Sequence, residues 1–410
     1  MKKKEIAAYA ELLVKKGVNL QKGEMLVISS PVEAAELAVA AVKAAYKAGA
    51  RNVEVKWMNE EVTRLSLKHR SKKQLAVVPD WMVAQSEYYI ENKIAYLGII
   101  CDDPEAFAGI DPSKTAILRR ATGTALKNFR EHTASNRLRW TIAAYPNEKW
   151  AKKVFPELSR KQATAKLWDY IAKTVRLDTE DPVRAWEEHQ KNIERRVKTL
   201  NDAKIKYFRY KNKYGTDLTV GMPKGYLFAG GAEAGLWDGV LFTANMPTEE
   251  VFSCPDRNTA EGKLVASMPL CRNGQIIKNF WLKFEKGRIT DFGAEEGYEN
   301  LKSIIETDEG SHYLGEIALV GYNSPIRDLG TLFYETLFDE NASCHFAIGD
   351  CYPSCVEGGA DMDENELLEK GLNNSLEHVD FMVGTEDLSI IAVKENGEEM
   401  TVFRNGNWCF

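Results

Sequence analysis

The first half of the chain alternates amphipathic helical patterns with short apolar runs. Apolar positions recur at helical spacing over residues 5–16, and the Ala-rich segment 31–48 has the same character and ends at Gly49. The run 24–29 is typical of a buried strand, and 52–57 alternates in its first half as a strand does. Strand, helix and strand at this spacing predict a βαβ unit, from which parallel sheets are built.

Two further strand-like runs, 95–100 and 139–144, extend this pattern. We therefore predict an α/β domain with a parallel sheet and covering helices. The sequence has no GxGxxG loop, so a bound dinucleotide is not indicated. From 159 to 201 the pattern becomes helical and highly charged, and Pro182 marks a helix start. We interpret this segment as a helical bridge.

After about residue 205 the pattern changes to short strand-like runs separated by Gly, Asn and Asp turns. The runs 388–393 and 400–403 predict a closing hairpin around Gly397. The second half is therefore predicted to be a mixed, largely antiparallel α+β domain. Since 410 residues exceed one ordinary core, we predict two domains, 1–204 and 205–410.

Composition narrows the class of protein. Hydrophobic residues make up 44% and charged residues 28%, the balance of an ordinary globular protein. The net charge is −6 with Lys and Arg scattered, so no nucleic-acid surface is expected. No apolar run approaches the length of a membrane helix, and the basic N-terminus leads into an amphipathic helix instead of a signal region. We expect a cytoplasmic protein that does not bind membranes.

The seven cysteines favour free thiols over a disulfide framework, because their number is odd and the chain is long. Cys344, Cys351 and Cys355 flank His345 and could form a zinc knuckle. The paired CxxC spacing typical of such sites is missing, which argues against that interpretation.

Five residues near short apolar runs are candidates for metal chemistry. His378 and Asp380 are separated by one residue at the start of a predicted strand, so their side chains project to the same side. Glu250, Glu316 and His345 lie in similar settings upstream. Imidazole and carboxylate groups are common ligands of zinc and similar divalent ions.

Taken singly, each candidate also has a purely structural interpretation. His345 could be a hydrogen-bonded core residue, and the carboxylate of Asp380 could merely orient the ring of His378. Glu250 could belong to a helix-capping sequence with Thr248 as the N-cap, and Glu316 could be a charge at the end of a helix or strand. A metal-free binding module, or a protein with one closed structural ion, would fit these interpretations.

Taken together, two Glu, two His and one Asp form the donor set of a site for two divalent cations. Carboxylates can bridge two ions, and a pair of ions about 3.5–4 Å apart can hold a hydrolytic water and the carbonyl it attacks. Bound metal lowers the pKa of water toward about 7, which supplies hydroxide at neutral pH.

The amino-acid sequences of four segments resemble those of a known family. The segments are 245–252 (NMPTEEVF), 314–320 (LGEIALV), 336–345 (TLFDENASCH) and 378–384 (HVDFMVG). In this order they closely resemble the thermophilic-type metalloaminopeptidase family, which includes aminopeptidases T and S and the streptococcal peptidase S. The resemblance spans essentially the full length of the chain.

The resemblance implies a cytoplasmic, homodimeric exopeptidase that removes N-terminal residues from peptides. Its C-terminal domain would be catalytic and would hold two divalent ions per chain: zinc, cobalt, magnesium or manganese. The metal ligands implied are Glu250, Glu316, His345, His378 and Asp380, the same five chosen above. The segment 253–255 (SCP) departs slightly from the family pattern and leaves these ligands untouched.

The resemblance also implies that Tyr352 hydrogen-bonds the reacting carbonyl or the tetrahedral intermediate. We expect a carboxylate to relay a proton to the leaving amine, with Glu316 as the first candidate and Glu249 as the second. The alternative activity is that of a dinuclear metal amidase, which would use the same ligands on a small substrate that is not a peptide.

Overall fold

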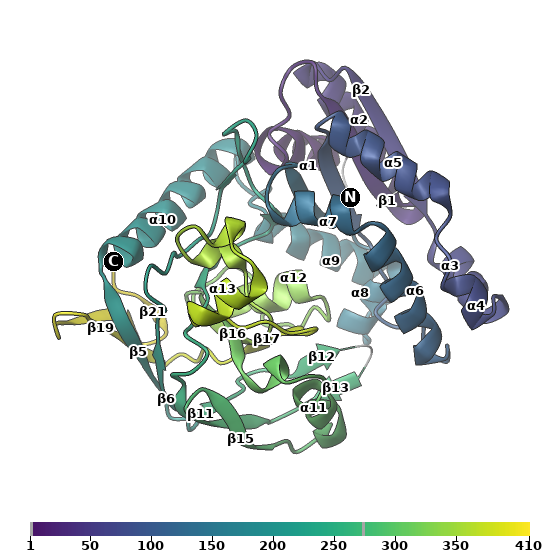
Figure 1. Cartoon of the computed structure of the whole chain (residues 1–410). Coiled ribbons are helices and arrows are strands. Elements are labelled where there is room, and N and C mark those ends of the chain that lie inside the picture. Colours follow the sequence, from purple (N-terminus) through teal and green to yellow (C-terminus); the bar gives the residue numbers. More distant parts are fainter. Residues whose placement is uncertain (1–2, 273–274) are drawn as a thin grey trace. The chain divides into compact units, whose positions relative to one another are not determined.

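The computed structural model describes residues 3–272 and 275–410 (Figure 1). The chain divides into two compact units, each with its own sheets. The first contains the described residues up to Glu188 together with Ala232–Pro247, and the second contains His189–Gly231 and Thr248–Phe410. The division predicted from sequence, 1–204 and 205–410, stays a prediction.

The first unit is built on a five-stranded parallel sheet with the strand order β2-β1-β3-β4-β9. Its strands are β1 (Met25–Pro31), β2 (Asn52–Met58), β3 (Ala95–Ile100), β4 (Trp140–Ala144) and β9 (Asn245–Met246). The four strands predicted in the first half are all present. β9 comes from a segment that the sequence analysis placed in the second half, and it pairs in parallel with β4.

Helices of the first unit begin and end where local sequence signals place them. α1 (Lys3–Leu12) continues into a π-helical turn, and α2 (Ala35–Ala48) ends at Gly49 in the left-handed conformation. Pro31 closes β1 instead of opening α2, and a 3-10 turn follows it. The remaining helices are α3 (Glu60–His69), α4 (Lys72–Leu75), α5 (Asp80–Glu91), α6 (Pro112–Ala125), α7 (Lys127–Ala134), α8 (Glu148–Val154) and α9 (Arg160–Thr174).

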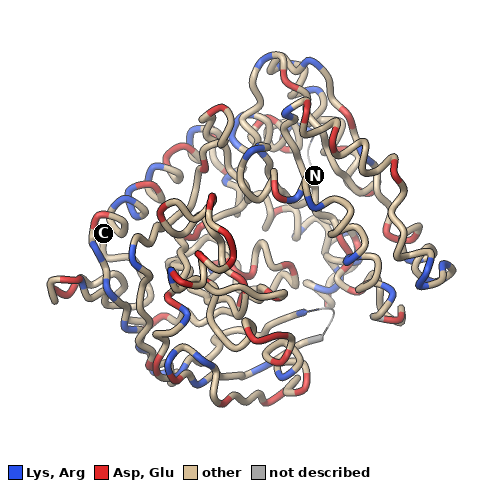
Figure 2. The backbone as a smooth tube through the Cα atoms, in the orientation of Figure 1, with Lys and Arg blue, Asp and Glu red and all other residues tan. Residues whose placement is uncertain are grey.

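The predicted helical bridge contains two long helices. α9 begins at a capping box formed by Ser159 and Gln162, and α10 (Pro182–Asp202) starts at Pro182 as predicted. In the part of the chain that the structure describes, no helix is both long and apolar enough to cross a membrane. Basic and acidic residues are interspersed along most of the chain (Figure 2), but residues 328–369 contain eleven Asp and Glu and no Lys or Arg.

The second unit contains an eight-stranded antiparallel sheet with the strand order β15-β14-β11-β6-β5-β19-β20-β21. Its strands are β5 (Ile205–Lys211), β6 (Asp217–Gly221), β11 (Glu261–Val265), β14 (Trp281–Glu285), β15 (Arg288–Gly293), β19 (Ser389–Lys394), β20 (Glu399–Arg404) and β21 (Asn407–Trp408). β19 and β20 form the predicted closing hairpin.

A second, four-stranded antiparallel sheet has the order β10-β16-β17-β18. These strands are β10 (Val251–Ser253), β16 (Leu314–Leu319), β17 (His345–Gly349) and β18 (His378–Met382). One face packs into the core of the unit through Ile317, Phe346, Ile348 and Phe381. The fold class predicted from sequence, a helix-covered parallel sheet followed by a mixed α+β part, is confirmed.

Candidate metal centre

The five candidate residues come together on the four-stranded sheet of the second unit. Glu250 directly precedes β10, Glu316 lies within β16, His345 opens β17, and both His378 and Asp380 belong to β18. Three neighbouring strands and the residue before a fourth therefore deliver these polar side chains, although the residues span 130 positions of sequence.

The strand register places these side chains on one face. Ala347 in β17 lies between Glu316 of β16 and Asp380 of β18, and directly opposed residues of antiparallel strands project to the same side. His345 and His378 lie two residues from members of this row, so they share its face. Ala347 is small, so the carboxylates of Glu316 and Asp380 can approach each other across it, and their potential ligand oxygens lie within 4.8 Å of one another.

The side chains form two overlapping groups that share one carboxylate. Nε2 of His345 lies 3.2 Å from Oε2 of Glu250 and 3.6 Å from Oε1 of Glu316. Nε2 of His378 lies 3.2 Å from Oε2 of Glu316 and 3.2 Å from Oδ1 of Asp380. In each group the potential ligand atoms lie within 4.8 Å of one another. Glu316 thus directs one oxygen to each group.

Backbone carbonyls orient both imidazoles. Nδ1 of His345 lies 3.1 Å from the carbonyl oxygen of Ser343, and Nδ1 of His378 lies 2.8 Å from that of Asp350. Donation of the Nδ1–H to these acceptors leaves Nε2 of each ring facing the carboxylates, where it donates a hydrogen bond when protonated and offers its lone pair to a cation when deprotonated. Metal-binding histidines are commonly fixed in this way through their second ring nitrogen.

The cluster is buried and carries an excess of negative groups. Only 8% of Glu250, 4% of Glu316 and 1% of His345 is exposed. Burial disfavours the charge of Glu316, but hydrogen bonds and positive charge from both histidines lower its pKa to about 2. Burial lowers the pKa of His345 and His378, and the neighbouring carboxylates more than reverse this, so both pKa values lie well above the ordinary range.

A further acidic residue, Glu340, faces the same cluster. It opens the 3-10 turn Glu340–Ala342, and burial together with the charges of Glu250 and Asp380 raises its pKa well above the usual range. Sequence reasoning missed Glu340, because no strand pattern or paired spacing marks it. The only available signal was its place five residues before His345, within one of the four segments that carry the family resemblance.

Tyr352 lies beside the cluster and is 46% exposed to solvent. Its ring centroid is 5.3 Å from that of His378 and 5.6 Å from that of Phe252, and its backbone N–H donates to Sγ of Cys254 at 3.2 Å. Desolvation and the surrounding carboxylates raise the pKa of Tyr352 well above 10. The phenol therefore stays neutral at physiological pH and can donate a hydrogen bond.

The structure separates two other candidates from this centre. Glu249 directs its carboxylate to His189, with 3.7 Å between Oε2 and Nε2, and its backbone N–H donates to Oδ1 of Asn341 at 2.7 Å. Among the described residues, neither group of potential metal ligands contains a cysteine. Cys351 and Cys355 pack instead with Cys254 in a small buried cluster, so the zinc-knuckle alternative is not supported.

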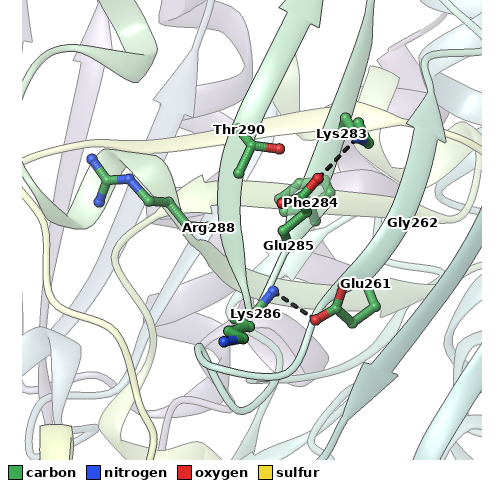
Figure 3. A pocket seen from close by; sticks show the side chains of 8 residues that line it. All are labelled: Glu261, Gly262, Lys283, Phe284, Glu285, Lys286, Arg288 and Thr290. Atoms are coloured by element: carbon green, nitrogen blue, oxygen red, sulfur yellow. Dashed lines mark hydrogen bonds and ion pairs between the residues drawn. The ribbon is translucent and has the colours of Figure 1, made fainter.

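A pocket elsewhere on the second unit does not compete with the centre. It lies over β11, β14 and β15, and both of its acidic side chains are bonded to other lining residues (Figure 3). Nζ of Lys283 is 2.9 Å from Oε1 of Glu285, and the backbone N–H of Lys286 donates to Glu261 at 2.7 Å. None of the residues singled out from the sequence lines this pocket.

Buried carboxylates and imidazoles held on one rigid sheet define a protein with a divalent-cation centre. Comparison with known proteins identifies the family. The sequence profile of the thermophilic metalloprotease family (M29) matches residues 2–408, and the chain belongs to this family.

Named relatives define the activity within the family. Aminopeptidase AmpS of Bacillus subtilis is 41% identical over 99% of this chain and 98% of its own length. Aminopeptidase T of Thermus aquaticus is 35% identical over 97% of both chains. The structure of wild-type AmpT from Thermus thermophilus matches with a TM-score of 0.93 and 34% identity, covering all of both chains. The chain is a metal-dependent aminopeptidase, and the amidase alternative is not supported.

Proposed function

We propose that the enzyme removes N-terminal residues from peptides at a centre holding two divalent cations. One cation would be bound by Glu250, His345 and Glu316, and the other by His378, Asp380 and Glu316. The observation that carries this proposal is the pair of ligand groups meeting at Glu316, one of whose oxygens faces each group. Glu316 would therefore be the bridging ligand.

The charges of the cluster fit bound cations. Four carboxylates, counting Glu340, face two imidazoles, and in the described part of the chain no Lys or Arg forms an ion pair with any of them. An uncompensated buried charge is costly. Hard oxygen donors combined with imidazole suit zinc, cobalt, manganese and magnesium. These residues thus form a site that positive charge stabilises.

When bound, such ions supply a nucleophilic water at neutral pH and polarise the carbonyl it attacks. The protein contributes a fixed frame: the backbone carbonyls of Ser343 and Asp350 hold both imidazoles in one orientation. The neutral phenol of Tyr352, whose ring lies 5.3 Å from that of His378, would donate a hydrogen bond to the oxygen on which negative charge develops. Preorganised donors of this kind usually supply a large share of catalysis.

Two carboxylates are candidates for moving the proton to the leaving amine. Glu316 was the first choice from sequence and remains a predicted catalytic residue. Its two oxygens already face the two ligand groups, which limits its freedom as a proton carrier. Glu340 faces the same cluster and belongs to neither group, so we add it as a second candidate in place of Glu249.

We also propose a cytoplasmic location and a homodimer. All seven cysteines are free, and Cys254, Cys351 and Cys355 remain thiols although they pack together. Unbridged neighbouring thiols suit a reducing compartment. The homodimer rests on the family resemblance and on an exposed sheet edge, which is treated in the next subsection.

The experiment that tests the two-cation centre measures metal content and activity on the same samples. Purified protein should carry two divalent ions per chain, lose hydrolysis of aminoacyl anilides on chelation, and regain it with added zinc, cobalt, magnesium or manganese. His345→Ala should lose bound metal and activity. His312→Ala is the matched control, because His312 bonds the carbonyl of Asp308 away from the cluster. A single ion at saturation, or full activity without metal, contradicts the proposal.

A further inference from the structure

We propose that two copies of the chain pair edge to edge along β2, antiparallel and centred on Val55, so that their parallel sheets join into one. This rests on the proposed homodimer and specifies its surface. Only residues of the first unit take part. The state of the metal centre in the second unit can therefore be measured independently of this pairing.

β2 is the exposed edge of its sheet. It pairs with β1 on one side, and among the described residues no strand pairs with its other side (Figure 1). A strand edge presents a row of unpaired N–H and C=O groups, and proteins usually shorten, charge, bulge or cover such edges. β2 has seven residues, no proline, and a register with β1 that shows no bulge. It has the length and regularity to template a second strand.

The sequence of β2 is self-complementary in one antiparallel register. Val55 is the midpoint of Asn52–Met58, so centring the pair there matches all seven residues of both strands. The same register sets Glu54 opposite the partner subunit's Lys56, twice by symmetry. It also sets Val53 opposite the partner subunit's Trp57. Opposite charges and aromatic–β-branched pairs are the cross-strand combinations that stabilise sheets.

Neighbouring registers lose this complementarity. Centring the pair on position 54 or 56 sets Glu54 or Lys56 against its own copy, and like charges directly opposite are destabilising. A twofold axis normal to the sheet keeps each face of the sheet on its own side, so directly opposed residues must point to the same face. If the axis passed between two residues, each residue would oppose one that points to the other face, because side chains alternate along a strand. Among these registers, centring on Val55 is therefore favoured.

Hydrogen bonds within the subunit hold the side chain of Glu54 in a fixed orientation before association. Its Oε1 accepts hydrogen bonds from the hydroxyl of Tyr89 at 2.6 Å and from Nε2 of Gln85 at 3.1 Å, both on α5. Nζ of Lys56 lies over the ring of Tyr89, 5.4 Å from its centroid. Glu54 and Lys56 therefore share the α5 face of the sheet, and ordering side chains before association reduces its entropic cost.

Large apolar side chains are exposed on β2 and on α5, the helix that bonds Glu54. Trp57 and Met58 in β2 are each 47% exposed. Trp81 of α5 is 64% exposed and lies one and two turns before Gln85 and Tyr89, on the helix face that meets Glu54. Apolar surface gathered beside an open strand edge is typical of a protein interface. A second copy presents matching apolar residues through the twofold axis.

Cysteine cross-linking tests the register directly. Val55→Cys should form a disulfide with its own copy in the native dimer, since directly opposed Cα atoms lie about 4.5–5.5 Å apart, within disulfide range. Val53→Cys is the matched control on the same face. Its copy would be displaced by four residues along the strand, roughly 13 Å, so no cross-link is expected. The bond is assigned by mass spectrometry of peptides, which separates it from links through the exposed Cys409.

Charge reversal provides a second measurement that does not depend on thiol chemistry. Lys56→Glu chains carry two acidic residues at the contact and Glu54→Lys chains carry two basic ones, so each alone should dimerise about tenfold or more weakly. An equimolar mixture restores both opposite-charge pairs and should form heterodimers, detected by native mass spectrometry. Unchanged metal content and aminoacyl-anilide hydrolysis confirm folding.

The outcomes separate this surface from the homodimer itself. A monomeric native protein overturns both proposals. A native dimer in which Val55→Cys cross-links no faster than Val53→Cys overturns the β2 surface and leaves the homodimer standing. Neither result bears on the metal centre, whose metal content is measured on the same samples.

Discussion

At the residue scale, Glu316 decides what the centre can do. It is the only acidic side chain shared by both ligand groups, and its burial would be costly without the two imidazoles that lower its pKa to about 2. His345 and His378 are fixed in turn by main-chain carbonyls, so the geometry of the cluster depends on the backbone more than on mobile side chains. Fixed donors of this kind favour precise ligand placement.

The most specific prediction for a single residue concerns Tyr352. Tyr352→Phe removes the phenolic donor and keeps the ring that contacts Phe252 and His378. We expect kcat to fall about 10²–10³-fold, as when one oxyanion donor is lost. Metal content and thermal stability should stay unchanged. Steady-state kinetics on aminoacyl anilides measure the effect, and a variant with native kcat would exclude Tyr352 from the reaction.

At the element scale, strong local patterns were predictable and long-range assembly was not. The buried runs that became β1 and β3 were evident, because their apolar residues are consecutive and bounded by turns. β9 has two residues and no periodicity of its own, so its pairing with β4 could not be foreseen. The five candidate residues were found from residue type and family resemblance. Glu340 was missed because a 3-10 turn leaves no comparable signal.

Ala347 in β17, an inner strand of the four-stranded sheet, leads to a prediction about the volume available to bound cations. Ala347 lies between Glu316 and Asp380 on the polar face, and side chains directly opposed across strands are about 4.5–5.5 Å apart. Ala347→Leu should place a bulky side chain between the two carboxylates, lower bound metal below two ions per chain, and abolish most activity. Overpacking itself should cost about 1–3 kcal/mol in the free energy of unfolding.

Ala347→Ser is the matched control, because serine adds little volume at the same position. It should keep metal content and activity near native values. Elemental analysis and thermal unfolding of both variants distinguish a blocked site from a misfolded sheet. Normal metal binding by Ala347→Leu would show that the cations do not occupy this part of the face.

At the scale of the whole molecule, bound cations and protons compete for the same centre. In the metal-free protein the carboxylates hold the pKa values of His345 and His378 well above 6.5, so both rings are protonated near neutral pH. The stabilisation from these raised pKa values is complete below about pH 6.5 and is lost as the pH rises through the folded-state values. Metal ligands must instead be deprotonated, so metal affinity increases with pH.

As the pH rises, the metal-free protein loses stability and the affinity for metal increases, so both effects enlarge the stability gained from bound metal. We expect the difference in melting temperature between zinc-saturated and chelator-treated enzyme to grow from pH 6 to pH 8. Each proton displaced on binding changes the affinity about tenfold per pH unit, or about 1.4 kcal/mol. Differential scanning calorimetry across this range measures the difference. A constant difference, or one that shrinks with rising pH, would mean that His345 and His378 are not the groups that exchange protons for metal.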